Sequence, residues 1–105
     1  MVFKEIQRNV DEWTSQFEPQ YWPPYEMLAS LTEEVGEISR EINHTYGNKK
    51  KKKDEKDNSI GKELTDIIFT VVCMANSEGI DLSKEWENMI NYKLYKRDNE
   101  RFEKK

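Results

Sequence analysis

The chain has 105 residues, of which 35% are hydrophobic and 36% are charged, and its formal net charge at pH 7 is −4. Such a chain has room for one small domain with a thin core, which a second copy of the chain would help to complete. The negative charge argues against a nucleic acid polymer as partner, because proteins that bind one are normally basic.

Neither a membrane partner nor export from the cell is expected. The N-terminal residues have no apolar signal segment, and the longest apolar run, Ile67–Ala75, is far shorter than the roughly 20 residues that span a membrane. A single cysteine, Cys73, excludes an intramolecular disulfide and fits a reducing compartment. We therefore expect a cytoplasmic protein.

The N-terminal half predicts two helices. From Val2 to Phe17, apolar residues recur every three or four positions, which indicates an amphipathic helix that ends at Glu18-Pro19. An aromatic linker follows, and Pro24 is well placed to open the second helix. Gly47 is expected to stop that helix in a left-handed conformation. The apolar seam of the second helix consists of Leu28, Leu31, Val35, Ile38 and Ile42.

A third helix is expected after a polar interruption. Residues 48–59, NKKKKKDEKDNS, have no apolar side chain and predict a mobile, solvated loop. Asn58 or Ser59 can cap the helix that follows, and Gly79 stops it. Between residues 67 and 75 this helix is apolar nearly all the way round, so we expect it to be buried on most sides.

A fourth helix completes the fold. Asp81 or Ser83 can cap it, and residues 96–105 form a charged tail. The sequence shows no repeat and no second domain. We therefore predict one all-α domain over residues 1–105, an antiparallel four-helix bundle-like fold that is completed by oligomerisation.

Two pairs of acidic residues stand at the edge of the apolar seams. Glu34 and Glu37 form an E-x-x-E pair, and Glu63 and Asp66 form an E-x-x-D pair. Residues three apart lie on the same side of a helix, so each pair points two carboxylates in one direction. In a chain with 21 acidic residues either motif alone also fits a solvated helix face. Both pairs on neighbouring helices favour a site for a hard cation such as Mg²⁺ or Mn²⁺.

A di-iron carboxylate bundle is a weaker interpretation of the same acids. Such bundles use Glu-x-x-His motifs, and the only histidine, His44, does not lie three residues after a glutamate.

Three stretches carry a resemblance to a known family. They are LTEEVGEISREIN (31–43), KELTDIIFTVVCMAN (62–76) and GIDL (79–82), and they resemble the MazG-like all-α nucleoside triphosphate pyrophosphohydrolases, whose hallmark is E-x-x-E, a variable loop and E-x-x-D. The resemblance implies Mg²⁺-dependent cleavage of the α–β phosphoanhydride of an NTP or dNTP, which gives the monophosphate and pyrophosphate. It also implies a homodimer or homotetramer with the active site near the subunit interface.

The resemblance implies roles for individual residues as well. Glu34, Glu37, Glu63 and Asp66 match the catalytic metal ligands, and one of them, or the adjacent Glu33, would orient or deprotonate the attacking water. These assignments come from the family pattern. The spacing of the acids alone supports only a hard-metal site.

Residues that would bind the nucleotide are less clearly marked. Lys93 and Arg97 are the candidate phosphate ligands, because they share one helix face and the family tends to carry basic residues there. The run 49–53 is more often a solvated loop, although it can also serve as a lid. Trp22 and His44 are candidates for base stacking, with packing and a helix C-terminal position as the alternative roles.

Several alternatives stay open on the sequence alone. Asn76 is polar within an apolar run and is either a core hydrogen-bonding residue or a reader of the base. A phosphoribosyl-ATP pyrophosphohydrolase has similar helices, but the Y-W-P and GIDL segments fit it less well. A helical interaction module without enzymatic activity would use the acids in salt bridges, and Mg²⁺ would then leave its thermal stability unchanged.

Overall fold

The computed structural model describes residues 2–47 and 59–105, and these residues contain helices and irregular segments without a strand. The predicted all-helical fold with four helices is confirmed within this part of the chain. The helices are α1 (Val2–Thr14), α2 (Pro24–Tyr46), α3 (Ile60–Ser77) and α4 (Leu82–Asn88), and α4 continues into a π-helix, η1 (Met89–Asp98). The loop predicted at 48–59 lies outside the described residues except for Ser59.

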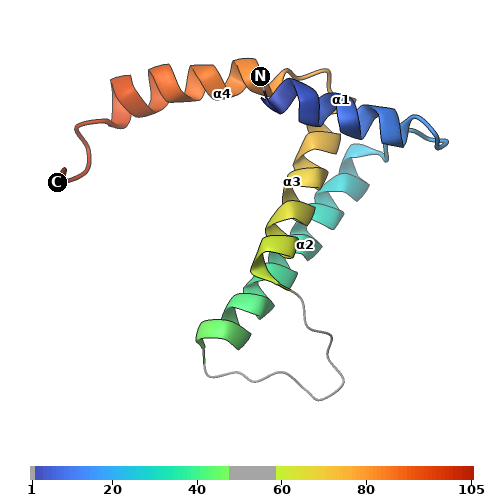
Figure 1. The fold of residues 1–105 in the computed structure, drawn as a ribbon, viewed down its shortest axis with the longest axis horizontal. Helices are drawn as coiled ribbons and strands as arrows, with labels where there is room; N and C mark the ends of the chain where they lie inside the picture. The colour runs from blue at the N-terminus through green and yellow to red at the C-terminus, as the bar shows by residue number, and fades with distance from the viewer. Residues whose placement is uncertain (1, 48–58) are drawn as a thin grey trace.

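The helices are arranged around an antiparallel hairpin. Helices α2 and α3 lie side by side along their length, and α1 packs across one end of α3 (Figure 1). Helix α4 contacts α1, and its continuation extends away from the hairpin. The radius of gyration is 17.3 Å, whereas a compact domain of this length has about 13 Å. The hairpin brings the two acidic pairs onto neighbouring helices.

Helix α1 ends earlier than the sequence predicted. It stops at Thr14, four residues before Glu18, so the prediction of this boundary was wrong. The physical reason lies in three consecutive polar side chains that compete for the last carbonyls of the helix. Each donates to the carbonyl oxygen three residues earlier, namely Thr14 to Asp11 at 3.2 Å, Ser15 to Glu12 at 2.7 Å and Gln16 to Trp13 at 2.9 Å.

Several other helix boundaries are those expected. Helix α2 begins at Pro24. Ser59 caps α3, because its hydroxyl accepts from the backbone N–H of Lys62 at 2.9 Å. Asp81 caps α4 with a carboxylate oxygen that accepts from the N–H of Ser83 at 3.0 Å. Gly79 follows α3 with φ +69°, which is the left-handed stop that was predicted.

Gly47 ends α2 in a different way from that predicted. Its φ of −95° and ψ of −171° are extended rather than left-handed. A Cβ at this position would lie 2.8 Å from the carbonyl oxygen of Asn43, so glycine is required here for a close backbone approach. At Gly36 of α2, by contrast, a Cβ would meet nothing within 4 Å among the described residues.

The apolar core of one chain is small. Among the described residues the buried apolar side chains are Met27, Val72 and Ala75. The expectation that the third helix is buried on most sides is not met within one chain, because α3 contacts α2 along one side and α1 near its end. More than a third of the surface of three of its apolar residues is exposed, namely Leu64, Ile68 and Val71. No helix in the described ranges is long and apolar enough to cross a membrane.

Candidate metal site and substrate pocket

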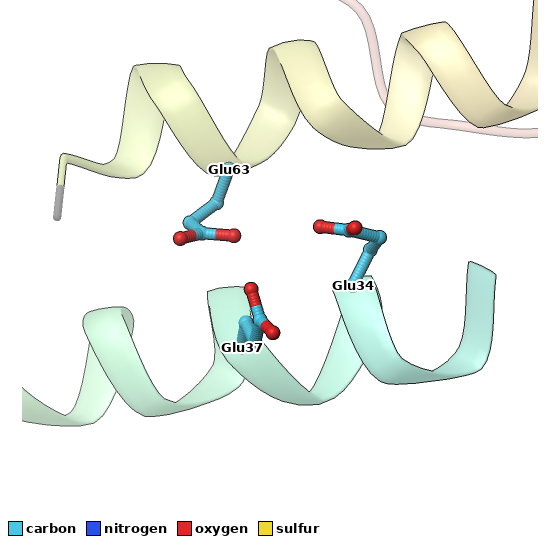
Figure 2. Close-up of side chains that lie close together, drawn as sticks. All are labelled: Glu34, Glu37 and Glu63. Carbon is cyan, nitrogen blue, oxygen red and sulfur yellow. The ribbon is translucent and has the colours of Figure 1, made fainter. Parts of the chain in front are cut away.

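Three glutamates meet between the two helices of the hairpin. Glu34 and Glu37 project from α2 and Glu63 projects from α3, with their carboxylates directed into the space between the helices (Figure 2). One carboxylate oxygen from each of the three residues lies within 4.8 Å of one from each of the other two. The geometry follows from the sequence, because residues three apart share a helix face and the Ser59 cap begins α3 one turn before Glu63. We call these three residues the carboxylate cluster.

Burial makes this cluster unusual. Glu63 is only 2% exposed. One carboxylate oxygen of Glu34 and one of Glu63 are buried without a hydrogen-bond partner in the described part of the chain. Buried carboxylate oxygens are normally hydrogen-bonded, since leaving them unpaired costs free energy. The two oxygens are therefore positioned to accept a ligand.

The electrostatics of the cluster agree with this geometry. Burial raises the pKa of the Glu34 carboxyl, and the neighbouring charges of Glu37, Asp66 and Glu33 raise it further. Burial is also the largest cause that raises the pKa of the Glu63 carboxyl. A hydrogen bond with Glu37 and the neighbouring negative charges raise this pKa further. Two carboxyl groups can share a hydrogen bond only when one of them carries a proton. Without a cation, the cluster thus favours retaining protons.

Asp66 lies beside the cluster rather than within it. It follows Glu63 by one turn of α3, and its charge contributes to the raised pKa of both Glu34 and Glu63. It is not among the three residues whose oxygens approach within 4.8 Å, in the range that the structure describes. Together with Glu34 it lines an adjoining pocket, so Asp66 stands where the cluster and this pocket meet.

The donor set suits a hard divalent cation. All the converging ligand atoms are carboxylate oxygens, which Mg²⁺, Mn²⁺ and Ca²⁺ prefer, whereas zinc sites generally include nitrogen or sulfur. A cation at this point would compensate the mutual repulsion of the carboxylates and occupy the two unpaired oxygens. The residues present therefore fit a divalent metal site.

An aromatic pocket adjoins the cluster. Its cavity has a volume of about 620 Å³, within the range of small-molecule sites. Rings from α1, the linker and α3 form its walls, and Trp13 makes edge-on contacts with Phe17 and Phe69 at ring-centroid distances of 4.9 and 6.0 Å. We call this cavity the aromatic pocket, and its aromatic lining consists of Trp13, Phe17, Tyr21, Trp22 and Phe69.

The other predicted substrate residues fall in different places. Trp22 lines the aromatic pocket. His44 lies near the C-terminal end of α2, seven residues beyond Glu37, and is not part of the pocket lining. Lys93 and Arg97 are exposed on η1, which extends away from the hairpin, so one chain does not bring them to the carboxylates (Figure 1). The Lys49–Lys53 run lies outside the described residues.

Sequence reasoning missed the aromatic pocket as a unit. Trp13 and Phe17 belong to the apolar stripe predicted from Val2 to Phe17, and Phe69 belongs to the third helix, which was expected to be buried on most sides. All three are in fact about half exposed in one chain. The available signal was the density of aromatic residues around the α1–α2 linker, but only the fold brings Phe69 of α3 to them.

A chain that has helices and no strand where described, with clustered carboxylates beside a cavity, has the features of an all-α hydrolase. The family model of the MazG nucleotide pyrophosphohydrolase domain matches residues 23–102, and the chain belongs to this family. The resemblance noted in the sequence is thereby confirmed, and with it the assignment of the protein as a hydrolase.

Individual relatives agree with this assignment. The chain is 44% identical over 104 residues to the protein YpjD of Bacillus subtilis (strain 168), covering 99% of this chain and 93% of that protein. A crystal structure of YpjD from Bacillus subtilis, which names it a candidate pyrophosphatase, is similar with a TM-score of 0.77 and 43% identity. The match covers 89% of this chain and 94% of the YpjD chain. The Bacillus-conserved MazG protein, a nucleotide pyrophosphohydrolase, is similar with a TM-score of 0.75 and 38% identity, covering 92% of this chain and 94% of its own.

Proposed function

We propose that this protein is a Mg²⁺-dependent nucleoside triphosphate pyrophosphohydrolase that cleaves the α–β phosphoanhydride bond of NTPs or dNTPs. The products are the nucleoside monophosphate and pyrophosphate. One observation carries the proposal: the carboxylate cluster and the aromatic pocket adjoin, and Glu34 belongs to both. A triphosphate whose base lies among the aromatic rings therefore has its phosphates at the carboxylates.

In this proposal Glu34, Glu37, Glu63 and Asp66 hold the Mg²⁺, which Mn²⁺ can replace. A bound divalent cation polarises phosphate oxygens and lowers the pKa of a water ligand. The unpaired buried oxygens of Glu34 and Glu63 supply free ligand atoms. A carboxylate of this set, or that of Glu33, accepts a proton from the attacking water and so orients it.

The pocket supports a nucleoside as the organic part of the substrate. Trp22 lines the pocket and is 58% exposed, so a base stacked on its ring removes apolar surface from water. Stacking is tolerant of the base, because every nucleobase has an aromatic face. The proposal therefore covers both purine and pyrimidine triphosphates.

We further propose that the active form is a homodimer or homotetramer. Helix α2 exposes one apolar stripe, and α3 exposes a second one, which is unusual for a soluble monomer. A second copy packed on these stripes would bury them and complete the bundle. The stripe of α2 is Leu28, Val35 and Ile42, and that of α3 is Leu64, Ile68 and Val71.

Such an assembly also gives Lys93 and Arg97 a role. A triphosphate needs cationic side chains in addition to a metal ion. These two residues belong to η1, which extends away from the α2–α3 hairpin (Figure 1). We propose that they reach the phosphates in the site of another copy. Mixing a Glu63→Gln protein with a Lys93→Ala/Arg97→Ala protein should then restore about a quarter of wild-type activity if they assemble as random dimers. If the two variants form mixed dimers and the mixture is still inactive, this arrangement is excluded.

The test of the function is a panel of NTPs, dNTPs and phosphoribosyl-ATP, incubated with Mg²⁺ and analysed for monophosphate and pyrophosphate. We expect turnover of at least one triphosphate, abolished by EDTA and by Glu37→Gln but retained by Glu87→Gln, which changes an exposed glutamate on α4. If phosphoribosyl-ATP is the one compound turned over, the proposed substrate class is wrong and the protein is a phosphoribosyl-ATP pyrophosphohydrolase. Absence of all turnover, with Glu37→Gln binding Mg²⁺ as well as wild type, would favour an interaction module instead.

A further inference from the structure

A hydrogen-bond network joins α1, the linker and α3 through Tyr21, which lines the aromatic pocket. The Tyr21 hydroxyl donates to a carboxylate oxygen of Asp11 at 2.7 Å and accepts from the side-chain amide of Asn76 at 3.0 Å. Asn76 also donates to the backbone carbonyl of Gln7 at 2.9 Å and accepts from the Gln7 side-chain amide at 2.9 Å. The side-chain oxygen of Gln7 also accepts from the backbone N–H of Leu82, at the start of α4, at 3.0 Å. The network therefore joins four parts of the chain, namely α1, the linker, α3 and the start of α4.

These contacts decide between the two roles that the sequence left open for Asn76. Both hydrogens of its amide nitrogen are used, one by Gln7 and one by Tyr21, and its oxygen is occupied by Gln7. Asn76 is also absent from the pocket lining within the described chain. It is therefore a hydrogen-bonding residue that acts through Tyr21, and it does not read the base directly.

Tyr21 belongs to a wall that needs such support. Five consecutive linker residues, 18–22, line the aromatic pocket. Within the described chain, no backbone N–H of residues 18–23 donates to another backbone group, so side chains must hold this segment in place. Gln20 contributes by donating to Asp11 at 3.0 Å, and Tyr21 contributes through Asp11 and Asn76.

We propose that Asn76 is a positioning residue, which fixes the linker wall of the aromatic pocket through the Tyr21 hydroxyl and thereby sets the affinity for the nucleoside part of the substrate. The inference rests on the proposed function for the identity of the substrate. In this proposal the rings hold the base in the same way before and during the reaction, and such uniform binding affects KM rather than kcat. Loss of this support should accordingly raise KM without lowering kcat.

The experiment compares Tyr21→Phe, Asn76→Ala and the double variant with wild type. Tyr21→Phe keeps the ring and removes two hydrogen bonds, so we expect KM for the best triphosphate to rise about three- to tenfold, with kcat within about twofold. Asn76→Ala should raise KM by a similar factor. The double variant should show no further rise, because both residues act through one contact. The matched control is Tyr25→Phe, which changes a tyrosine that is 86% exposed on α2 and should leave KM unchanged.

A merely structural role gives a different result. In that case Tyr21→Phe and Asn76→Ala lower the melting temperature while KM stays at the wild-type value, and the inference is wrong. Failure of the proposed function is recognised separately, because wild type then turns over no triphosphate. Binding of the Mg²⁺ complex of a triphosphate, followed by tryptophan fluorescence, then decides the inference: weaker binding by Tyr21→Phe supports it, whereas equal binding, or no binding even by wild type, overturns it.

Discussion

Replacing Glu63 by glutamine should change stability in opposite directions with and without Mg²⁺. In the metal-free protein this carboxyl is buried close to two others, and its raised pKa shows that the charged form is disfavoured. Glutamine has nearly the same shape, carries no charge and can donate to Glu37 without an added proton. We therefore expect Glu63→Gln to melt at a higher temperature than wild type in EDTA.

In saturating Mg²⁺ the order should reverse. At a free Mg²⁺ concentration 100 times the dissociation constant, binding stabilises the folded state by about 2.7 kcal/mol. If the variant binds about 100-fold more weakly, the same concentration stabilises it by only about 0.4 kcal/mol. For a domain of this size 1 kcal/mol corresponds to roughly 4–8 °C in Tm, so wild type should gain roughly 10–20 °C and the variant roughly 2–3 °C.

The assay is thermal unfolding followed by circular dichroism over a Mg²⁺ titration, at constant ionic strength and protein concentration. Glu87→Gln on α4 is the matched control and should follow the wild-type curve. The reasoning would be refuted by a Glu63→Gln protein that is less stable than wild type in EDTA. It would equally be refuted if Mg²⁺ raised the Tm of variant and wild type by the same amount.

Three further predictions concern other features. In EDTA, the pKa values of Glu34 and Glu63 are raised above the ordinary 4.5, so the folded state binds protons more tightly than the unfolded chain does. The protonated carboxyls therefore contribute their full stability below pH 4.5, and this contribution is lost as the pH rises through the raised pKa values. The Tm of the wild type in EDTA should thus fall as the pH rises above 4.5, and the Tm of a Glu34→Gln/Glu63→Gln variant should fall less. Removing the α4 cap with Asp81→Ala should cost about 1 kcal/mol in urea unfolding, and an equal midpoint would contradict the cap assignment. Burial raises the pKa of the Cys73 thiol, so it should react with iodoacetamide at neutral pH more slowly than free cysteine, and a rate as fast would contradict this environment.

Local features of the fold were predictable because they depend on residues close in sequence. Proline at the start of α2, the Ser59 and Asp81 caps and the left-handed Gly79 each follow from the conformation or hydrogen bonding of a few neighbouring residues. The end of α1 was missed because the side chain of Thr14 and those that follow it compete locally with the helix, which a pattern of apolar spacing does not register.

The candidate site was predictable in part for the same reason. Helical spacing alone places Glu34 beside Glu37, and a hairpin of two helices suffices to bring Glu63 to them. The aromatic pocket depends on contacts across more than 50 residues, such as that between Trp13 and Phe69, and on a linker without regular structure. No periodicity encodes such contacts, so the pocket and its Asn76 support emerge only from the fold.

The energetics of Glu63 give an independent argument that the cluster is functional. The core of one chain is so small that Glu63 ranks with Val72 as the largest fully buried side chains in the range described. An apolar residue at that position would add to the core, whereas a carboxyl beside Glu34 and Glu37 reduces the stability of the metal-free fold. A buried carboxyl without a compensating partner departs from normal core packing. Such departures are expected at positions that binding or catalysis requires. The two unpaired oxygens fit the compensating partner that we propose, which is a cation that takes carboxylate ligands.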